Sequence, residues 1–148
     1  MAGMAGVTQL AIFQLGGQDY AIDILQVKEI VARGPVTPVP NAPAGLEGVI
    51  ELRGAILPVV DLAHVLGLTS GARTRVILVR QGDAVIGLAV DGVREVIRMP
   101  QERLGPAPAG APPAFSGSFH QSDRVVLVLD PARAIPPEVA RRPTTPSP

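Results

Sequence analysis

Short apolar stretches, each ending at a turn signal, run through most of the chain and predict β-strands. Residues 10–15, LAIFQL, are rich in strand formers and are followed by the turn-like GGQD. Residues 20–24, YAIDI, then alternate between two faces with the period of two that a half-buried strand shows. These stretches predict a hairpin, and residues 27–31, VKEIV, predict a further strand.

A second pair of strands is predicted around an arginine and a glycine. Residues 33–45 separate this pair from the first strands, because so many prolines are incompatible with regular structure. The apolar runs on either side of ELRG, residues 51–54, predict the two strands. Asp61 is then a candidate N-cap for a short helix over residues 62–66, which Gly67 is placed to end.

The same order of elements recurs after a shift of about 66 residues. VKEIV lies over VREVI at residues 93–97, and Gly16 falls on Gly82. Beyond a three-residue insertion, Asp61 falls on Asp130. We interpret the chain as two copies of one plan, each with about five strands. Half of the chain is small for an independent core, so the two units are expected to share one and to form a binding surface between them.

Composition narrows the classes of function. The 148 residues include 13 basic and 13 acidic side chains, for a formal net charge of zero, and only 3% are aromatic. A neutral chain with few rings for base stacking does not favour nucleic-acid binding, which we keep only as a remote alternative. No apolar run approaches the roughly 20 residues of a spanning helix, and the N-terminus lacks a signal-peptide pattern, so the expected location is the cytoplasm.

Candidate catalytic side chains do not form a recognisable constellation. His64 lies on the expected short helix. His120 lies near Ser118 and Ser122 in a polar turn, without the strand-turn-helix context of a hydrolase nucleophile. Because the two histidines have no spaced ligand cluster around them and the chain has no cysteine, we expect no metal site and no cofactor. The chain is not expected to be an enzyme.

Several glycines are expected to have structural roles in turns. The glycine-bearing stretches lack the spacing of a phosphate-binding loop and are interpreted as hairpin connections. Asp91-Gly92 is the strongest two-residue hairpin signal among them. Gly48 and Gly54 are the other glycines to which we assign a structural turn.

Three charged positions on the expected strands admit different interpretations. Glu29 and Glu95 are equivalent positions of the two repeats, which favours solvent-facing strand residues over a catalytic pair of carboxylates. Arg53 has two readings that the residues alone leave open. It is either a strand-end arginine that pairs with Glu51, or a side chain that projects from a tight turn at Gly54 toward the cleft between the units, where arginine is a common interface anchor.

Four stretches of the chain together match a known pattern. They are FQLGGQDYAIDILQVKEI, VTPVPNAPAGLEGVIELRGAILPVVDL, RVILVRQGDAVIGLAVDGVREVI and VVLVLDPARAI, and they extend from about residue 10 to residue 135. In this ordered set the sequence resembles the CheW family of chemotaxis coupling proteins. That family usually has Asn-Leu-Arg-Gly around the arginine, whereas this chain has Glu51 in place of the asparagine.

The resemblance implies an all-β fold of two SH3-like five-stranded β-barrel subdomains that share a hydrophobic core, with short helices. A flexible N-terminus would cover residues 1–9 and a disordered, proline-rich tail residues 137–148. One CheW-like domain would cover residues 10–136. Its subdomains would comprise about residues 10–72 and 73–136, with the exchange of edge strands between them left open.

The resemblance also implies a function and its partners. The protein would be a non-catalytic adaptor that couples the cytoplasmic tips of chemoreceptors to the regulatory, CheW-like domain of a CheA-type histidine kinase, in association with membrane receptor arrays. Carried over residue by residue, Val27, Glu29 and Arg53 would bind the receptor, while the kinase-binding residues stay unassigned. A CheW-like adaptor of another chemosensory pathway, such as one that controls pili, surface sensing or development, is the alternative.

Overall fold

The structure is a computed structural model, and it describes residues 6–69, 71–140 and 145–146. The elements of the first half are β1 (Val7–Leu15), β2 (Gln18–Asp23), η2 (Ile24–Gln26), β3 (Val27–Ala32), β4 (Leu46–Leu52), β5 (Ala55–Asp61) and α1 (Leu62–Leu66). Those of the second half are β6 (Arg75–Gln81), β7 (Ala84–Val90), β8 (Gly92–Pro100), η3 (Gln101–Arg103), β9 (Phe115–Gln121), β10 (Arg124–Leu129), α2 (Pro131–Ala134), α3 (Pro137–Ala140) and β11 (Thr145–Pro146).

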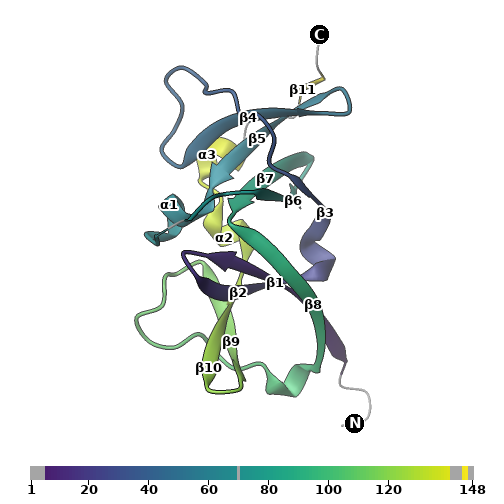
Figure 1. Cartoon of the computed structure of the whole chain (residues 1–148), viewed down its shortest axis with the longest axis vertical. Coiled ribbons are helices and arrows are strands. Elements are labelled where there is room, and N and C mark those ends of the chain that lie inside the picture. Colours follow the sequence, from purple (N-terminus) through teal and green to yellow (C-terminus); the bar gives the residue numbers. More distant parts are fainter. Residues whose placement is uncertain (1–5, 70, 141–144, 147–148) are drawn as a thin grey trace.

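Two β-sheets form the body of the molecule (Figure 1). Sheet A has the strand order β8-β1-β2-β10-β9, and sheet B has the order β11-β5-β7-β6-β3, with β4 paired to β5. The all-β prediction with two subdomains is confirmed, but the strand pairings of the described residues do not close either sheet into a barrel. The gaps lie between β3 and β4 and between β8 and β9, and each contains one isolated bridge. Thr37 after β3 pairs with Val49 of β4, and Gly105 after β8 pairs with Ser118 of β9.

Each sheet contains strands from both halves of the chain. The β1-β2 hairpin pairs with β8 and β10 of the second half, and the β6-β7 hairpin pairs with β3 and β5 of the first half. The expected division at residues 72 and 73 therefore does not separate the two sheets, and the exchange includes more than edge strands. The cause is local: η2 leads the chain from β2 into the other sheet, and Asp91 leads it from β7 in sheet B to β8 in sheet A.

The two halves repeat the same strand pairings, including their irregularities. In β3 the register shifts between Val27 and Glu29 opposite β6, and in β8 it shifts between Val93 and Glu95 opposite β1. A shift of 66 residues relates both pairs. The β4-β5 and β9-β10 hairpins likewise share a shift at corresponding positions, and the β5-β7 and β2-β10 pairs are both parallel. The duplication predicted from the sequence is therefore present in the backbone.

Three apolar clusters explain why many strands lack a polar face. The largest cluster takes residues from both sheets and from α1, α2 and α3, and Phe13 of β1 belongs to it. A second cluster lies within sheet A and includes Leu10 and Ile12, so alternate residues of β1 enter different cores. A third cluster lies within sheet B and includes Leu78. The shared core that was predicted is the largest of the three.

Both predicted terminal regions contain ordered elements. Strand β1 begins at Val7, inside the range 1–9 that was expected to be flexible, and Thr8 is buried. Helix α3 and strand β11 fall within the range 137–148 that was expected to be disordered, and Val139 of α3 is fully buried in the largest cluster. Apolar contacts of Val139 hold α3 in place, although the proline-rich composition of this range argued against an ordered element. Residues 1–5, 141–144 and 147–148 lie outside the described residues.

The glycines assigned to turns have three different roles. Gly54 lies in the β4-β5 turn with φ 83°. Gly48 lies instead within β4 at the register shift, where an added Cβ would overlap the carbonyl oxygen of Thr37. Gly92 begins β8 and pairs with Gln14 of β1, so Asp91-Gly92 is not a hairpin turn: β7 and β8 belong to different sheets.

Candidate functional site

The β4-β5 turn projects Arg53 from the end of sheet B. Leu52 pairs with Ala55, which leaves Arg53 and Gly54 as the two turn residues. Both have positive φ, 48° and 83°, as in the tight two-residue turns whose twist suits a hairpin. Glycine adopts this conformation without strain, whereas arginine does so rarely. The Arg53 side chain is 63% exposed, so a short and rigid connection presents its guanidinium to solvent.

Arg53 reaches Glu29 on β3, which lies across the gap between β3 and β4. Arg53 Nη2 donates a hydrogen bond to Glu29 Oε1, and the two side chains form an ion pair. Glu29 follows the register shift in β3, with its side chain 32% exposed. The structure thus brings together two of the three residues predicted to bind a receptor. Of the alternatives for Arg53, the ion pair with Glu29 of the same sheet is a third arrangement that the sequence reasoning missed.

The ion pair shifts the pKa of both groups in the direction that favours their charged forms. The hydrogen bond from Arg53 is the main cause that lowers the pKa of the Glu29 carboxyl. Desolvation opposes it as the second-largest cause, and the positive charges of Arg53 and Lys28 each add a smaller lowering effect. The Glu29 carboxylate in turn raises the pKa of Arg53. Both groups therefore keep their charges throughout the pH range in which proteins usually work.

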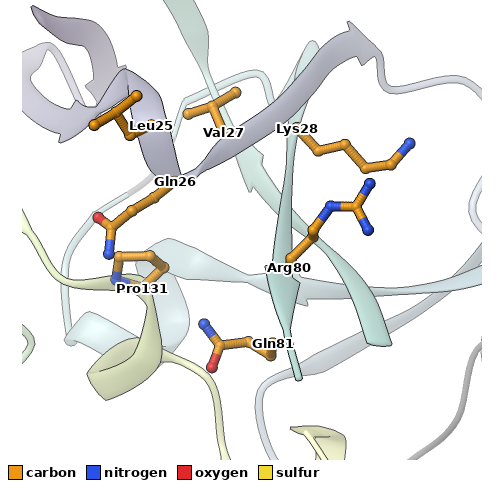
Figure 2. Close-up of a pocket in the computed structure, with 7 residues that line it drawn as sticks. All are labelled: Leu25, Gln26, Val27, Lys28, Arg80, Gln81 and Pro131. Carbon is orange, nitrogen blue, oxygen red and sulfur yellow. The ribbon is translucent and has the colours of Figure 1, made fainter. Parts of the chain in front are cut away.

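Val27 lies in a neighbouring cavity of about 240 Å³ where η2 crosses between the sheets (Figure 2). Three apolar residues line part of it: Val27, the start of α2 at Pro131, and Leu25, which is 89% exposed. The polar lining residues are Gln26, Lys28, Arg80 and Gln81. Leu25 thus adds exposed apolar surface at the edge of this cavity.

The other chemical candidates have structural contacts. Ser118 Oγ donates a hydrogen bond to the backbone carbonyl of Pro106, and the backbone amide of His64 donates to Asp61, which caps α1 as predicted. Glu29 lies in sheet B and Glu95 in sheet A, as expected for equivalent positions of two repeats. The described residues contain no group of three or more histidines, cysteines or acids able to hold a metal ion. Within the same residues, no helix is long and apolar enough to cross a membrane.

Comparison with known proteins decides the family. The family model of the CheW-like domain matches residues 9–137. The chain belongs to the CheW-like domain family. Chemotaxis protein CheW of Klebsiella aerogenes is 40% identical over 120 residues, which are 73% of this chain and 72% of that protein.

Further CheW-like proteins share the fold and most of the length. The crystal structure of the scaffolding protein TtCheW from Thermoanaerobacter tengcongensis superposes with a TM-score of 0.78 at 29% identity, covering 84% of this chain and 85% of that one. Protein PilI of Pseudomonas aeruginosa is 30% identical over 126 residues, 80% of this chain and 70% of that protein. Membership of this family indicates a chemotaxis adaptor rather than an enzyme.

Several residues that line the cavity beside Val27 were not identified from the sequence. Leu25, Lys28 and Arg80 line the same cavity, but none was singled out. The repeat contained a signal for two of them. It aligns the basic residues Lys28 and Arg94, and it places the basic Arg80 at the position of the neutral Gln14. What the repeat could not reveal is that the chain crosses between sheets at η2, which brings β3 beside β6.

Proposed function

We propose that the protein couples the cytoplasmic tip of chemoreceptors to a CheA-type histidine kinase, without catalysis and without a cofactor. The observation that carries the proposal is the Glu29–Arg53 ion pair, held by a rigid turn near an open cavity with an exposed leucine. Such a surface serves recognition, because arginine makes forked hydrogen bonds and exposed apolar side chains supply contact area.

The receptor is proposed to bind along β3 and the β4-β5 turn. Receptor tips are helical, so the expected mode is a helix that lays its apolar face into a groove. Val27 would supply apolar contact. Glu29 would fix the orientation of Arg53, and Arg53 would donate hydrogen bonds to the receptor.

The kinase is proposed to bind through its own CheW-like regulatory domain at other exposed surfaces, which we do not assign to residues. Each pairwise contact needs only modest affinity, because an array of receptors and kinases raises the effective concentration. We therefore expect dissociation constants of roughly micromolar, or about 8 kcal/mol. The protein would work in the cytoplasm beneath a membrane receptor array.

A reconstituted kinase assay tests the proposal. The measurement is phosphate incorporation by the cognate CheA-type kinase, with receptor cytoplasmic fragments on a template, in the presence of the protein or of Arg53→Ala. We expect the wild-type protein to raise kinase activity only when receptor is present, and the folded variant to fail. If the wild-type protein neither binds the kinase nor changes its activity, the proposal is wrong.

A second candidate keeps the adaptor role but changes the pathway. The observation that favours it is the similarity to Protein PilI, a relative that is not named a chemotaxis protein. The adaptor would then serve a chemosensory system that controls pili, surface sensing or development. The two candidates separate in the same assay when kinases and receptors from each pathway are compared, since only the cognate set should respond.

A further inference from the structure

Lys28 and Arg80 place two positive charges on the rim of the cavity beside Val27. Both side chains line it, and their charged ends point to the same side (Figure 2). Within the part of the chain that the structure describes, neither residue forms an ion pair. Because their strands β3 and β6 are neighbours, the two cations repel each other, and the charge of Glu29, which is itself paired with Arg53, offsets Lys28 only in part.

Sheet A shows how the position equivalent to Lys28 is neutralised. Arg94 lies in the register shift of β8, where Lys28 lies in that of β3. Arg94 Nη1 donates to Asp19 Oδ2 at 2.6 Å, and the Asp19 side chain is only 5% exposed. In sheet A the buried carboxylate of Asp19, a residue of the first half of the chain, therefore holds the cation, and Arg124 Nη1 lies 3.6 Å from the same carboxylate oxygen.

Sheet B has a second cation in place of this compensation. Gln14 pairs with Asp19 across the β1-β2 hairpin, and Arg80 pairs with Val85 at the equivalent place in the β6-β7 hairpin. Val85 of sheet B thus stands where sheet A has the carboxylate of Asp19, and Arg80 stands where sheet A has the neutral amide of Gln14. The three positions carry a net charge of zero in sheet A and of two positive charges, Lys28 included, in sheet B.

The residues around Lys28 and Arg80 indicate which kind of ligand would bind there. Leu25, Val27 and Pro131 line the same cavity, with Leu25 and Pro131 on the side away from the two charged ends (Figure 2), and Leu25 is 89% exposed. A partner that fits both features is an amphipathic helix with a carboxylate at the margin of its apolar face. An arginine and a lysine together bind one carboxylate through charge-assisted hydrogen bonds.

We propose that Lys28 and Arg80 bind an aspartate or glutamate side chain of the receptor helix, and so select receptors that carry an acidic residue at that place. The inference rests on the proposed function, since it takes the docked helix to be a receptor tip. It assigns to Lys28 and Arg80 a role separate from that of the Glu29–Arg53 pair, which lies outside the residues that line this cavity.

Calorimetric titration of a receptor cytoplasmic fragment tests this role. The variants are Lys28→Gln/Arg80→Gln and, as the matched control, Arg75→Gln at the exposed other end of β6. The double variant should bind about tenfold more weakly, and added salt should reduce the difference from wild type. Its melting temperature should not fall, because the change relieves repulsion. Equal affinity of the double variant and wild type, or the same loss in Arg75→Gln, would overturn the inference.

A charge reversal separates this inference from the proposed function. Lys28→Glu/Arg80→Glu should lose binding, and a receptor fragment in which one acidic residue is replaced by lysine should restore it. If Arg53→Ala abolishes binding while the Lys28 and Arg80 variants bind as wild type does, this inference fails and the proposed function stands. If the wild-type protein does not bind any receptor fragment, both fail.

Discussion

The guanidinium of Arg53 and the carboxylate of Glu29 join β4-β5 to β3 at a place where these strands are not paired as a sheet. Other links across this gap are the bridge between Thr37 and Val49 and the ion pair of Arg33, directly after β3, with Glu47 of β4. The ion pair is exposed, so it adds little to stability by itself. Its effect is to fix the direction of the Arg53 side chain on a surface that we propose to bind the receptor.

Because the two residues act as a unit, their substitutions should not be additive. Arg53→Ala and Glu29→Ala should each weaken binding of a receptor fragment, and the double variant should be no weaker than Arg53→Ala alone. Melting temperatures of all three should stay close to wild type. A double-mutant cycle measured by calorimetry checks this, and additive losses would show that Glu29 contacts the receptor independently.

The pH dependence of the pair has a defined sign. Arg53 lowers the pKa of Glu29 in the folded protein, so the stabilisation from the pair is present above the ordinary glutamate pKa of about 4.3 and is lost as pH falls through the lowered value. An NMR titration of the Glu29 carboxyl should give a midpoint below the ordinary value, and Arg53→Ala should raise it. An unchanged midpoint in Arg53→Ala would mean that the pair does not persist in solution.

Strand content and repeat were predictable from the sequence because they depend on local pattern. The period-two alternation of YAIDI, the cap at Asp61 and the coincidence of Glu29 with Glu95 all reflect short-range rules, and the structure contains β2, α1 and two matching register shifts at these places. Val27, Glu29 and Arg53 were named by the resemblance to the CheW family rather than by local pattern, and their contact with a receptor stays a prediction.

Strand exchange was not predictable, because it depends on which partner each strand finds. Asp91-Gly92 has the composition of a hairpin turn, yet Asp91 is held elsewhere: its carboxylate accepts hydrogen bonds from the amides of Gly16, at 2.6 Å, and Gly71, at 2.7 Å. These contacts involve residues far away in the sequence. The Lys28 and Arg80 pair was not predictable for the same reason, because the two residues come together only where β3 of the first half pairs with β6 of the second half.

Exchange predicts that neither half folds alone. A fragment of residues 1–72 would contain the β1-β2 hairpin without β8 and β10, and a fragment of residues 73–148 would contain the β6-β7 hairpin without β3 and β5. Each should lack dispersed amide signals in an NMR spectrum, while an equimolar mixture should recover the spectrum of the intact chain. Native-like dispersion in one isolated fragment would argue against the exchanged topology.

Two glycines near the site should differ in their cost of substitution. An alanine at Gly48 would overlap Thr37 and place its Cβ 2.8 Å from Val36 Cγ1, so Gly48→Ala should destabilise the fold by about 2–3 kcal/mol. No atom lies within 4 Å of a Cβ at Gly54, so Gly54→Ala should cost only its positive φ, about 1 kcal/mol. Urea unfolding measures both, and equal losses would contradict the close contact at Gly48.

Helix α3 should contribute to stability although its composition is that of a tail. Val139 is fully buried in the cluster shared by both sheets, whereas the adjacent Glu138 is exposed. Val139→Ala removes two buried methyl groups and should lower the free energy of unfolding by about 2 kcal/mol. Glu138→Ala is the matched control and should change it little.

Because α3 follows α2 directly after Pro136, loosening α3 exposes the shared core rather than the receptor surface. The receptor affinity of the folded Val139→Ala protein should therefore equal that of wild type. Urea unfolding and calorimetry on the same samples test both statements, and unchanged stability would mean that α3 does not pack in solution.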